Sequence, residues 1–133
     1  MRRSATWSKA EREQSGPMKH YSAAAVPWTK GRGYQKRILL AQEHLGIEGS
    51  FLQEVAFEPG SKVPLHYHRQ TTEVFFALDR AFFQIGKEKV VMEPEDVLIC
   101  EPGDVHGNPE VPQPFRILVL KVNFHEDDTV WLE

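Results

Sequence analysis

The sequence contains very little cysteine. Cys100 is the only thiol among 133 residues, so an intrachain disulfide and a multi-cysteine zinc cluster are both excluded. A chain without disulfides suits a reducing compartment, and we expect a cytoplasmic protein. Cys100 lies inside a short apolar run, where a cysteine is expected to fill the core rather than act as a nucleophile.

A strong net charge and long apolar runs are also missing. The 16 basic and 19 acidic residues give a formal charge of -3, which offers no long-range attraction to nucleic acid or anionic lipid. No segment approaches the 18 consecutive apolar residues of a membrane span, and no signal peptide precedes the first polar stretch. We therefore expect a soluble protein whose partners include neither nucleic acid nor a membrane.

The length and composition indicate one domain with a short extension. Residues 1–17 are rich in charged and small polar side chains and end in Gly16-Pro17, a composition that predicts a flexible N-terminal arm. Residues 18–133 are long enough to bury one core and too few for two domains. No internal repeat divides this segment.

The apolar residues after position 35 occur in short runs separated by turn residues, and no useful helical stripe is present. This pattern is typical of an all-β barrel or sandwich. In the last run both faces are largely apolar, which predicts a strand covered on both sides. The expected strands are 36–41, 51–57, 73–78, 81–85, 89–92, 97–100 and 115–124.

Four residues form a candidate metal site. His66 and His68 are two apart, so in a strand both imidazoles point to the same face. A hairpin through the polar stretch that follows would place Glu73 opposite them, and the turn before His106 would return that side chain across the sheet. Three imidazoles and a carboxylate suit a first-row divalent metal ion. His20, His44 and His125 have no such partners and are expected to be solvated or structural.

The same residues carry a resemblance to the cupin superfamily. Its first motif is Gly, five residues, His-x-His, three or four residues, Glu, six residues, Gly, and here Gly60, His66, His68 and Glu73 match. The second motif is Gly, five residues, Pro-x-Gly, two residues, His, three residues, Asn, and Gly103 and His106 match it. The resemblance spans roughly 51–122. Four positions depart from the motifs, none of them a ligand: Arg80, Glu95, Glu101 and Glu110.

The resemblance implies a jelly-roll barrel, or double-stranded β-helix, that holds one divalent ion (Fe, Mn, Ni or Zn) near its mouth. If Glu73 faces inward, alternation sends Phe75 and Ala77 the same way, with either Phe83 and Ile85 or Phe82 and Gln84 on the neighbouring strand. We assign no catalytic residue outside the metal ligands. The candidates for an acid or base each have a simpler role in the fold: Tyr67, Glu54, Gln53, Arg37 and Glu101.

Two classes of function follow from this resemblance. One is a metal-dependent enzyme on a small molecule, with either dioxygenase-like or isomerase/lyase-like chemistry. The alternative is a non-catalytic module that binds or senses a small molecule. The family resemblance also implies a homodimer, formed either by pairing sheet to sheet or by exchange of N-terminal strands, for which 21–28 is a candidate arm. The segment 127–133 is expected to cover a barrel edge.

Overall fold

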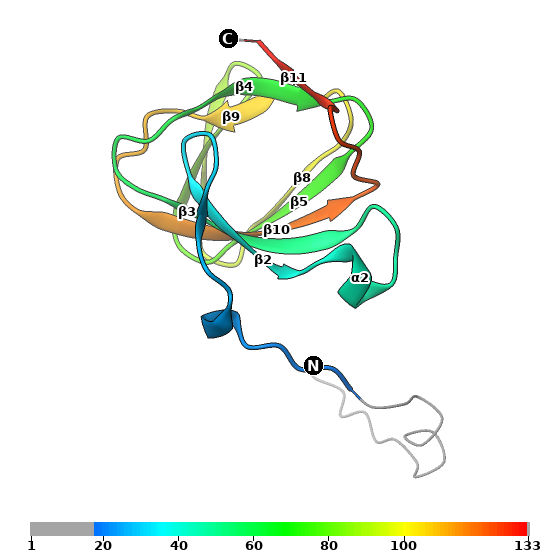
Figure 1. Cartoon of the computed structure of the whole chain (residues 1–133). Helices are drawn as coiled ribbons and strands as arrows, with labels where there is room; N and C mark the ends of the chain where they lie inside the picture. The colour runs from blue at the N-terminus through cyan, green and yellow to red at the C-terminus, as the bar shows by residue number, and fades with distance from the viewer. Residues whose placement is uncertain (1–17, 133) are drawn as a thin grey trace, which may run out of the picture.

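The computed structural model describes residues 18–132, so the flexible arm expected at 1–17 lies outside the described residues. Between residues 29 and 132 the regular secondary structure is β-strand apart from the short helix α2 (Figure 1). Within the described range no helix has the length and apolarity needed to cross a membrane. The elements are η1 (Ala23–Ala25), β1 (Thr29–Lys30), β2 (Gln35–Leu40), α2 (Gln42–Leu45), β3 (Phe51–Phe57), β4 (Val63–His68), β5 (Thr72–Ala77), β6 (Ala81–Ile85), β7 (Glu88–Met92), β8 (Val97–Cys100), β9 (His106–Asn108), β10 (Phe115–Val122) and β11 (Thr129–Trp131).

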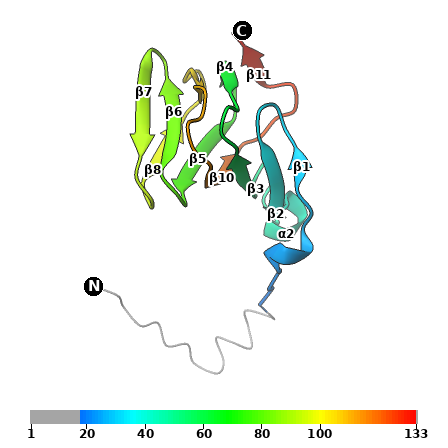
Figure 2. The same cartoon turned by 90° about the vertical axis from the view of Figure 1, so that its left-hand side faces the viewer.

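The strands form two antiparallel sheets that face each other, as the jelly roll requires (Figures 1 and 2). One sheet has six strands in the order β1-β2-β3-β10-β5-β8, and the other has five in the order β11-β4-β9-β6-β7. Apolar side chains from the two inner faces fill the space between them. Phe57 stacks on Phe115 with ring centroids 4.5 Å apart, and Phe75 and Phe83 meet from opposite sheets at 5.1 Å. The all-β jelly roll predicted from the sequence is confirmed.

The connection between β4 and β5 is not the hairpin expected from the sequence. β4 pairs with β9 and β11, whereas β5 pairs with β10 and β8 in the opposite sheet. The loop 69–71 therefore crosses from one sheet to the other. As a result, Glu73 faces the two histidines of β4 across the barrel interior rather than from a neighbouring strand.

The last long strand, β10, also differs from expectation, because only one of its faces is covered. Phe115, Ile117 and Val119 point inward and are each 1% exposed. On the outer face Leu120 and Val122 remain 37% and 43% exposed. The expectation that both faces are covered is therefore wrong for a single chain, and the outer face of the six-stranded sheet presents apolar side chains to solvent.

Two of the departures from the cupin motifs have different structural consequences. Glu95 takes the place of a motif glycine and has φ of 77°, the left-handed conformation that glycine adopts without strain. Arg80, in place of the other glycine, is not among the described residues with positive φ. The glycine preference at position 95 therefore reflects the turn between β7 and β8.

Candidate metal centre

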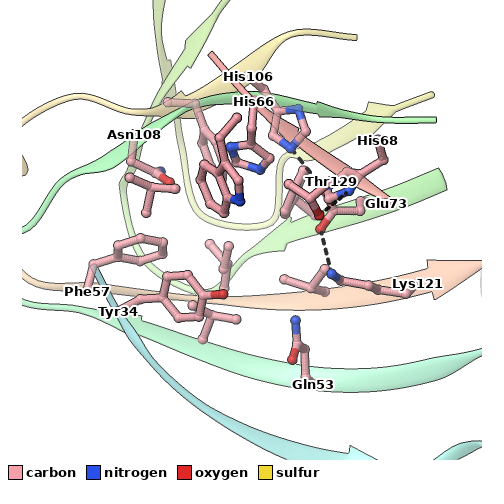
Figure 3. Close-up of a pocket in the computed structure, with 17 residues that line it drawn as sticks. Tyr34, Gln53, Phe57, His66, His68, Glu73, His106, Asn108, Lys121 and Thr129 are labelled. Atoms are coloured by element: carbon pink, nitrogen blue, oxygen red, sulfur yellow. Dashed lines mark hydrogen bonds and ion pairs between the residues drawn. The ribbon is translucent and has the colours of Figure 1, made fainter. Parts of the chain in front are cut away.

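The four predicted ligands converge inside the barrel. His66 and His68 come from β4, Glu73 from β5 and His106 from β9, and all four side chains are buried. One donor atom from each lies within 4.8 Å of every other. Figure 3 shows the three imidazoles and the carboxylate pointing toward one another at one end of a cavity. Three elements from two sheets thus build the cluster, which is why it is distant along the sequence but compact in space.

Hydrogen bonds to the outer ring nitrogens orient the imidazoles. His66 Nδ1 lies 2.8 Å from the carbonyl oxygen of Pro64, and His106 Nδ1 lies 2.9 Å from that of Asp104. A carbonyl only accepts, so each Nδ1 carries the proton. Nε2 of His66 is left with a lone pair, whereas Nε2 of His106 lies 3.1 Å from Glu73 Oε1 and donates a hydrogen bond to it, a proton whose place a metal ion would take. His68 Nδ1 lies 3.1 Å from Thr129 Oγ1 and can donate in the same way. This is the arrangement that fixes metal-binding histidines in proteins.

The inner nitrogen of His68 is the most informative atom of the cluster. His68 Nε2 is buried and has no hydrogen-bond partner among the described residues. It approaches Glu73 Oε1 at 2.6 Å, but the angles are not those of a hydrogen bond. A buried nitrogen without a hydrogen bond is costly, and a lone pair that faces a carboxylate oxygen is stabilised by a cation that both atoms bind.

The dimensions of the cluster fit a single ion. Nitrogen and oxygen ligands bind a divalent transition metal at about 2.0–2.2 Å, so two ligands on opposite sides of an ion are at most about 4.4 Å apart. The observed spread of up to 4.8 Å closes to this value with small side-chain rotations. The donor set and its spacing therefore suit a metal ion.

Burial and neighbouring charges set the protonation states. Burial is the main cause that lowers the pKa of His66 to about 4, which keeps the ring neutral and able to bind a cation. Burial alone would raise the pKa of Glu73, but His106, His68 and Lys121 outweigh it and hold that pKa well below its usual range. Burial lowers the pKa of His106, yet hydrogen bonds with Cys100 and Glu73 reverse the effect and raise it. The cluster therefore contains an ionised carboxylate at neutral pH.

The cavity next to the cluster has a free volume of about 110 Å³ and an apolar wall with a few polar groups. Phe75 and Phe83 line it, so Phe83 rather than Phe82 is the inward residue of β6. Ala77 points inward but belongs to the core beneath the cavity. Trp131 lies against His66 with ring centroids 4.5 Å apart, so β11 both closes the edge of β4 and contributes to the cavity wall.

Of the five acid or base candidates from the sequence, the structure places only Gln53 in the cavity. Glu54 is buried on the outer face of the sheet, where it pairs with Arg37 at 2.7 Å and Arg116 at 3.2 Å. Tyr67 is not among the lining residues, and Glu101 is exposed in the turn before β9. The polar lining residues that sequence reasoning missed are Tyr34, Lys121, Asn108 and Thr129.

The lysine among these missed residues could have been found by alternation along β10. Ile117, Val119 and Lys121 share the inward face, and Lys121 Nζ lies 3.5 Å from Glu73 Oε2.

Cys100 is buried opposite Glu73 in the pairing of β5 with β8 and belongs to the core, as predicted. His44 and His125 bind backbone groups near their own positions and take no part in the cluster.

Comparison with known proteins agrees with this architecture. The family model described as a cupin domain matches residues 53–120, which is about half of the chain and contains all four clustered residues. The protein therefore belongs to the cupin family. A search of curated proteins found no match.

Solved structures share the fold at low sequence identity. The polyketide cyclase RemF from Streptomyces resistomycificus superposes with a TM-score of 0.72 and 20% identity over 88% of each chain. KdgF from Halomonas sp. gives a TM-score of 0.69 and 17% identity over 84% of this chain and 98% of its own. A variant of Streptomyces Pac13 solved with uridine gives 0.66 and 10% over 88% and 92%. Pac13 is described as a nucleoside dehydratase.

Proposed function

We propose that this cupin is a metal-dependent enzyme that acts on a small molecule, with one Fe, Mn, Ni or Zn ion held by His66, His68, Glu73 and His106. The observation that carries the proposal is the buried His68 Nε2, which has no hydrogen-bond partner among the described residues and points at a carboxylate oxygen 2.6 Å away. A merely structural cluster would be expected to satisfy that nitrogen with a hydrogen bond.

The surroundings of the cluster support an enzyme. When bound, the ion would supply either Lewis acidity or chemistry with dioxygen. The chain itself contributes the cavity beside the cluster, an apolar wall that limits water, and Lys121 next to Glu73. Two proteins of the same fold are described as a cyclase and a dehydratase, and these names favour the isomerase/lyase-like arm of the proposal.

Elemental analysis of the natively purified protein tests the ligand assignment. About one transition-metal ion per chain is expected. His66→Ala and His106→Ala each remove one donor, and their metal content should fall well below the parent value. His125→Ala changes an exposed histidine outside the cluster and is the matched control. Equal metal content in the parent and both cluster variants would contradict the assignment.

Turnover measurements separate the two classes of function. The metal-loaded protein is incubated with enolic, phenolic and sugar substrates while product formation and oxygen consumption are followed. Product without oxygen uptake would identify an isomerase or lyase, and product with uptake an oxygenase. Tight reversible binding with no product would replace the enzyme by the binding or sensing module.

We also propose that a second copy of the chain covers the outer face of the six-stranded sheet. The pairing register places Val97, Ile99, Leu120 and Val122 on this face, together with other apolar residues of β5 and β10. A two-fold contact sets this face against itself. The nearest charges on the face, Glu54 with Arg37 and Arg116, are already paired with one another. Light scattering should report a dimer for the parent protein. Ile99→Glu should give a monomer, whereas Val91→Glu on the other sheet should not.

A further inference from the structure

The cavity contains a second orphaned polar group, distant from the imidazoles. Gln53 is 5% exposed, and its Oε1 has no hydrogen-bond partner among the described residues. In Figure 3 its amide points into the cavity from β3, below Lys121 and beside Tyr34. None of the four clustered donors needs this amide. A buried carbonyl oxygen left unpaired is costly, so its position indicates a ligand that donates a hydrogen bond to it.

A single cation faces the same space. Lys121 is the only lysine or arginine among the residues that line the cavity, and its side chain is 15% exposed. Its nearest anion is Glu73, whose Oε2 lies 3.5 Å from Nζ, a loose contact compared with charge-assisted hydrogen bonds of about 2.7–2.9 Å. Lys36 lies close enough to interact with Lys121, since burial and then the charge of Lys121 lower the pKa of Lys36. The cation is therefore only partly compensated.

The charges in the cavity favour an anionic ligand. Glu73 contributes one negative charge, whereas a divalent ion and Lys121 together would contribute three positive charges. The excess of positive charge lies in a buried space, where unbalanced charge is costly and an entering anion is attracted. A neutral ligand would leave that excess in place.

The spacing of the two side chains limits the size of the ligand. Gln53 is paired with Val119 in the register of β3 and β10, and Lys121 is two residues further along the same face. Such diagonal neighbours are about 7–8 Å apart. That distance separates the starting points of the two side chains, and both extend into the same cavity, so a ligand with a carboxylate and a hydroxyl on adjacent carbon atoms can contact both groups. A larger ligand would have to extend beyond the 110 Å³ of the cavity.

We propose that the cavity binds a small hydroxycarboxylate, with Lys121 Nζ pairing with its carboxylate and Gln53 Oε1 accepting from its hydroxyl. This assignment rests on the proposed function, because the ion accounts for part of the positive charge. It names the substrate class that the metal-dependent enzyme would accept. Lys121 and Gln53 are binding residues here, and the proposal gives neither a proton-transfer role.

Calorimetry with lactate, lactamide and propionate tests the assignment, in the absence and in the presence of added Zn²⁺. Lactamide replaces the carboxylate by a neutral amide, and propionate lacks the hydroxyl. The parent protein should bind lactate at least about tenfold more tightly than lactamide and about three- to tenfold more tightly than propionate.

Four variants assign these preferences to residues. Lys121→Met should reduce the preference for lactate over lactamide by at least about tenfold, and Lys121→Arg should restore most of it. Lys89→Met removes the same charge from the exposed strand β7 and should change nothing. Gln53→Leu should abolish the preference for lactate over propionate, and it should raise the melting temperature because it removes an unpaired buried oxygen.

The outcomes separate this inference from the proposed function. If the protein holds about one metal ion per chain but Lys121→Met and the parent discriminate the probes equally, the hydroxycarboxylate assignment is wrong and the metal centre stands. If no metal binds, the proposed function fails, while the titrations without Zn²⁺ still show whether Lys121 and Gln53 select lactate. Equal affinity of the parent for all three probes overturns the inference under either condition.

Discussion

Replacing Asp128 with asparagine is expected to lower the free energy of unfolding by about 3 kcal/mol. The Asp128 carboxylate accepts hydrogen bonds from the backbone N–H groups of Arg69, Gln70 and Thr71 at 2.9, 2.9 and 2.8 Å, and from the Thr71 hydroxyl at 2.5 Å. It therefore fastens the loop that crosses between the two sheets. That loop also sets the distance from His68 to Glu73.

The magnitude follows from the hydrogen bonds that asparagine cannot make. Its Oδ1 can still accept from Arg69 and Gln70, but its Nδ2 would face the N–H and hydroxyl of Thr71. Thr71 is 1% exposed, so its N–H would be left without an acceptor. Losing a hydrogen bond to a charged group costs about 1.5–3 kcal/mol, and an unpaired buried donor costs about 1–3 kcal/mol. A loss near 3 kcal/mol corresponds to a melting temperature lower by roughly 10 °C.

The pH dependence provides a second signature. Burial would raise the pKa of Asp128, but the hydrogen bonds with Thr71, Gln70 and Arg69 outweigh it and lower the pKa. A carboxyl group with a lowered pKa in the folded state stabilises the protein above its unfolded pKa, near 3.9, and loses that effect as the pH falls. The difference between the parent and Asp128→Asn should be constant from about pH 6 to 8 and shrink below about pH 4.

Urea denaturation at several pH values measures both effects. Asp127→Asn makes the same chemical change at the adjacent, exposed position and is the control. The reasoning is refuted if Asp128→Asn is as stable as Asp127→Asn at pH 7. It is also refuted if the stability difference persists unchanged down to pH 3.

Three other substitutions have defined outcomes. Glu95→Gly should raise the stability by about 0.5–1 kcal/mol, because it relieves the left-handed strain of φ 77°, and a lower melting temperature would contradict this. Gly107→Ala should destabilise the protein and reduce its metal content. The added Cβ would lie 2.6 Å from the carbonyl oxygen of Val63 and would push β9 away from β4. Unchanged metal content would contradict this prediction. Thr129→Val removes the partner of His68 Nδ1 and should weaken metal binding about 10- to 100-fold in a chelator competition. Equal metal affinity of the parent and the variant would contradict this prediction.

The sequence was sufficient to predict the strands with strong alternation and clear turns. The runs 51–57, 81–85 and 97–100 coincide with β3, β6 and β8, and the other four expected strands match to within two residues at either end. Four strands are missing from the expected set. The strands β1, β9 and β11 have two or three residues each, and a pattern of period two has no meaning over that length. The fourth, β4, has six residues, but its sequence contains Pro64 and two histidines and lacks an alternating apolar pattern. Their existence depends on pairing with distant segments.

The candidate site was predictable in its residues but not in its construction. The spacing of His66, His68 and Glu73 along the chain pointed to one centre, and the structure brings them together. The choice of sheet for β4 and β5 was not predictable, because loop 69–71 is held by Asp128 from 57 residues away. Lys121 was overlooked because its run appeared apolar on both faces.

The tryptophan of β11 makes the interior of the barrel optically observable. Its indole lies 4.5 Å from the His66 imidazole and 4.0 Å beneath the guanidinium of Arg32. A paramagnetic ion such as Co²⁺ or Ni²⁺ in the cluster would quench the emission of that indole at such short range. Fluorescence of the unlabelled protein, with Trp131→Phe as the blank, would then follow occupancy of the barrel in real time.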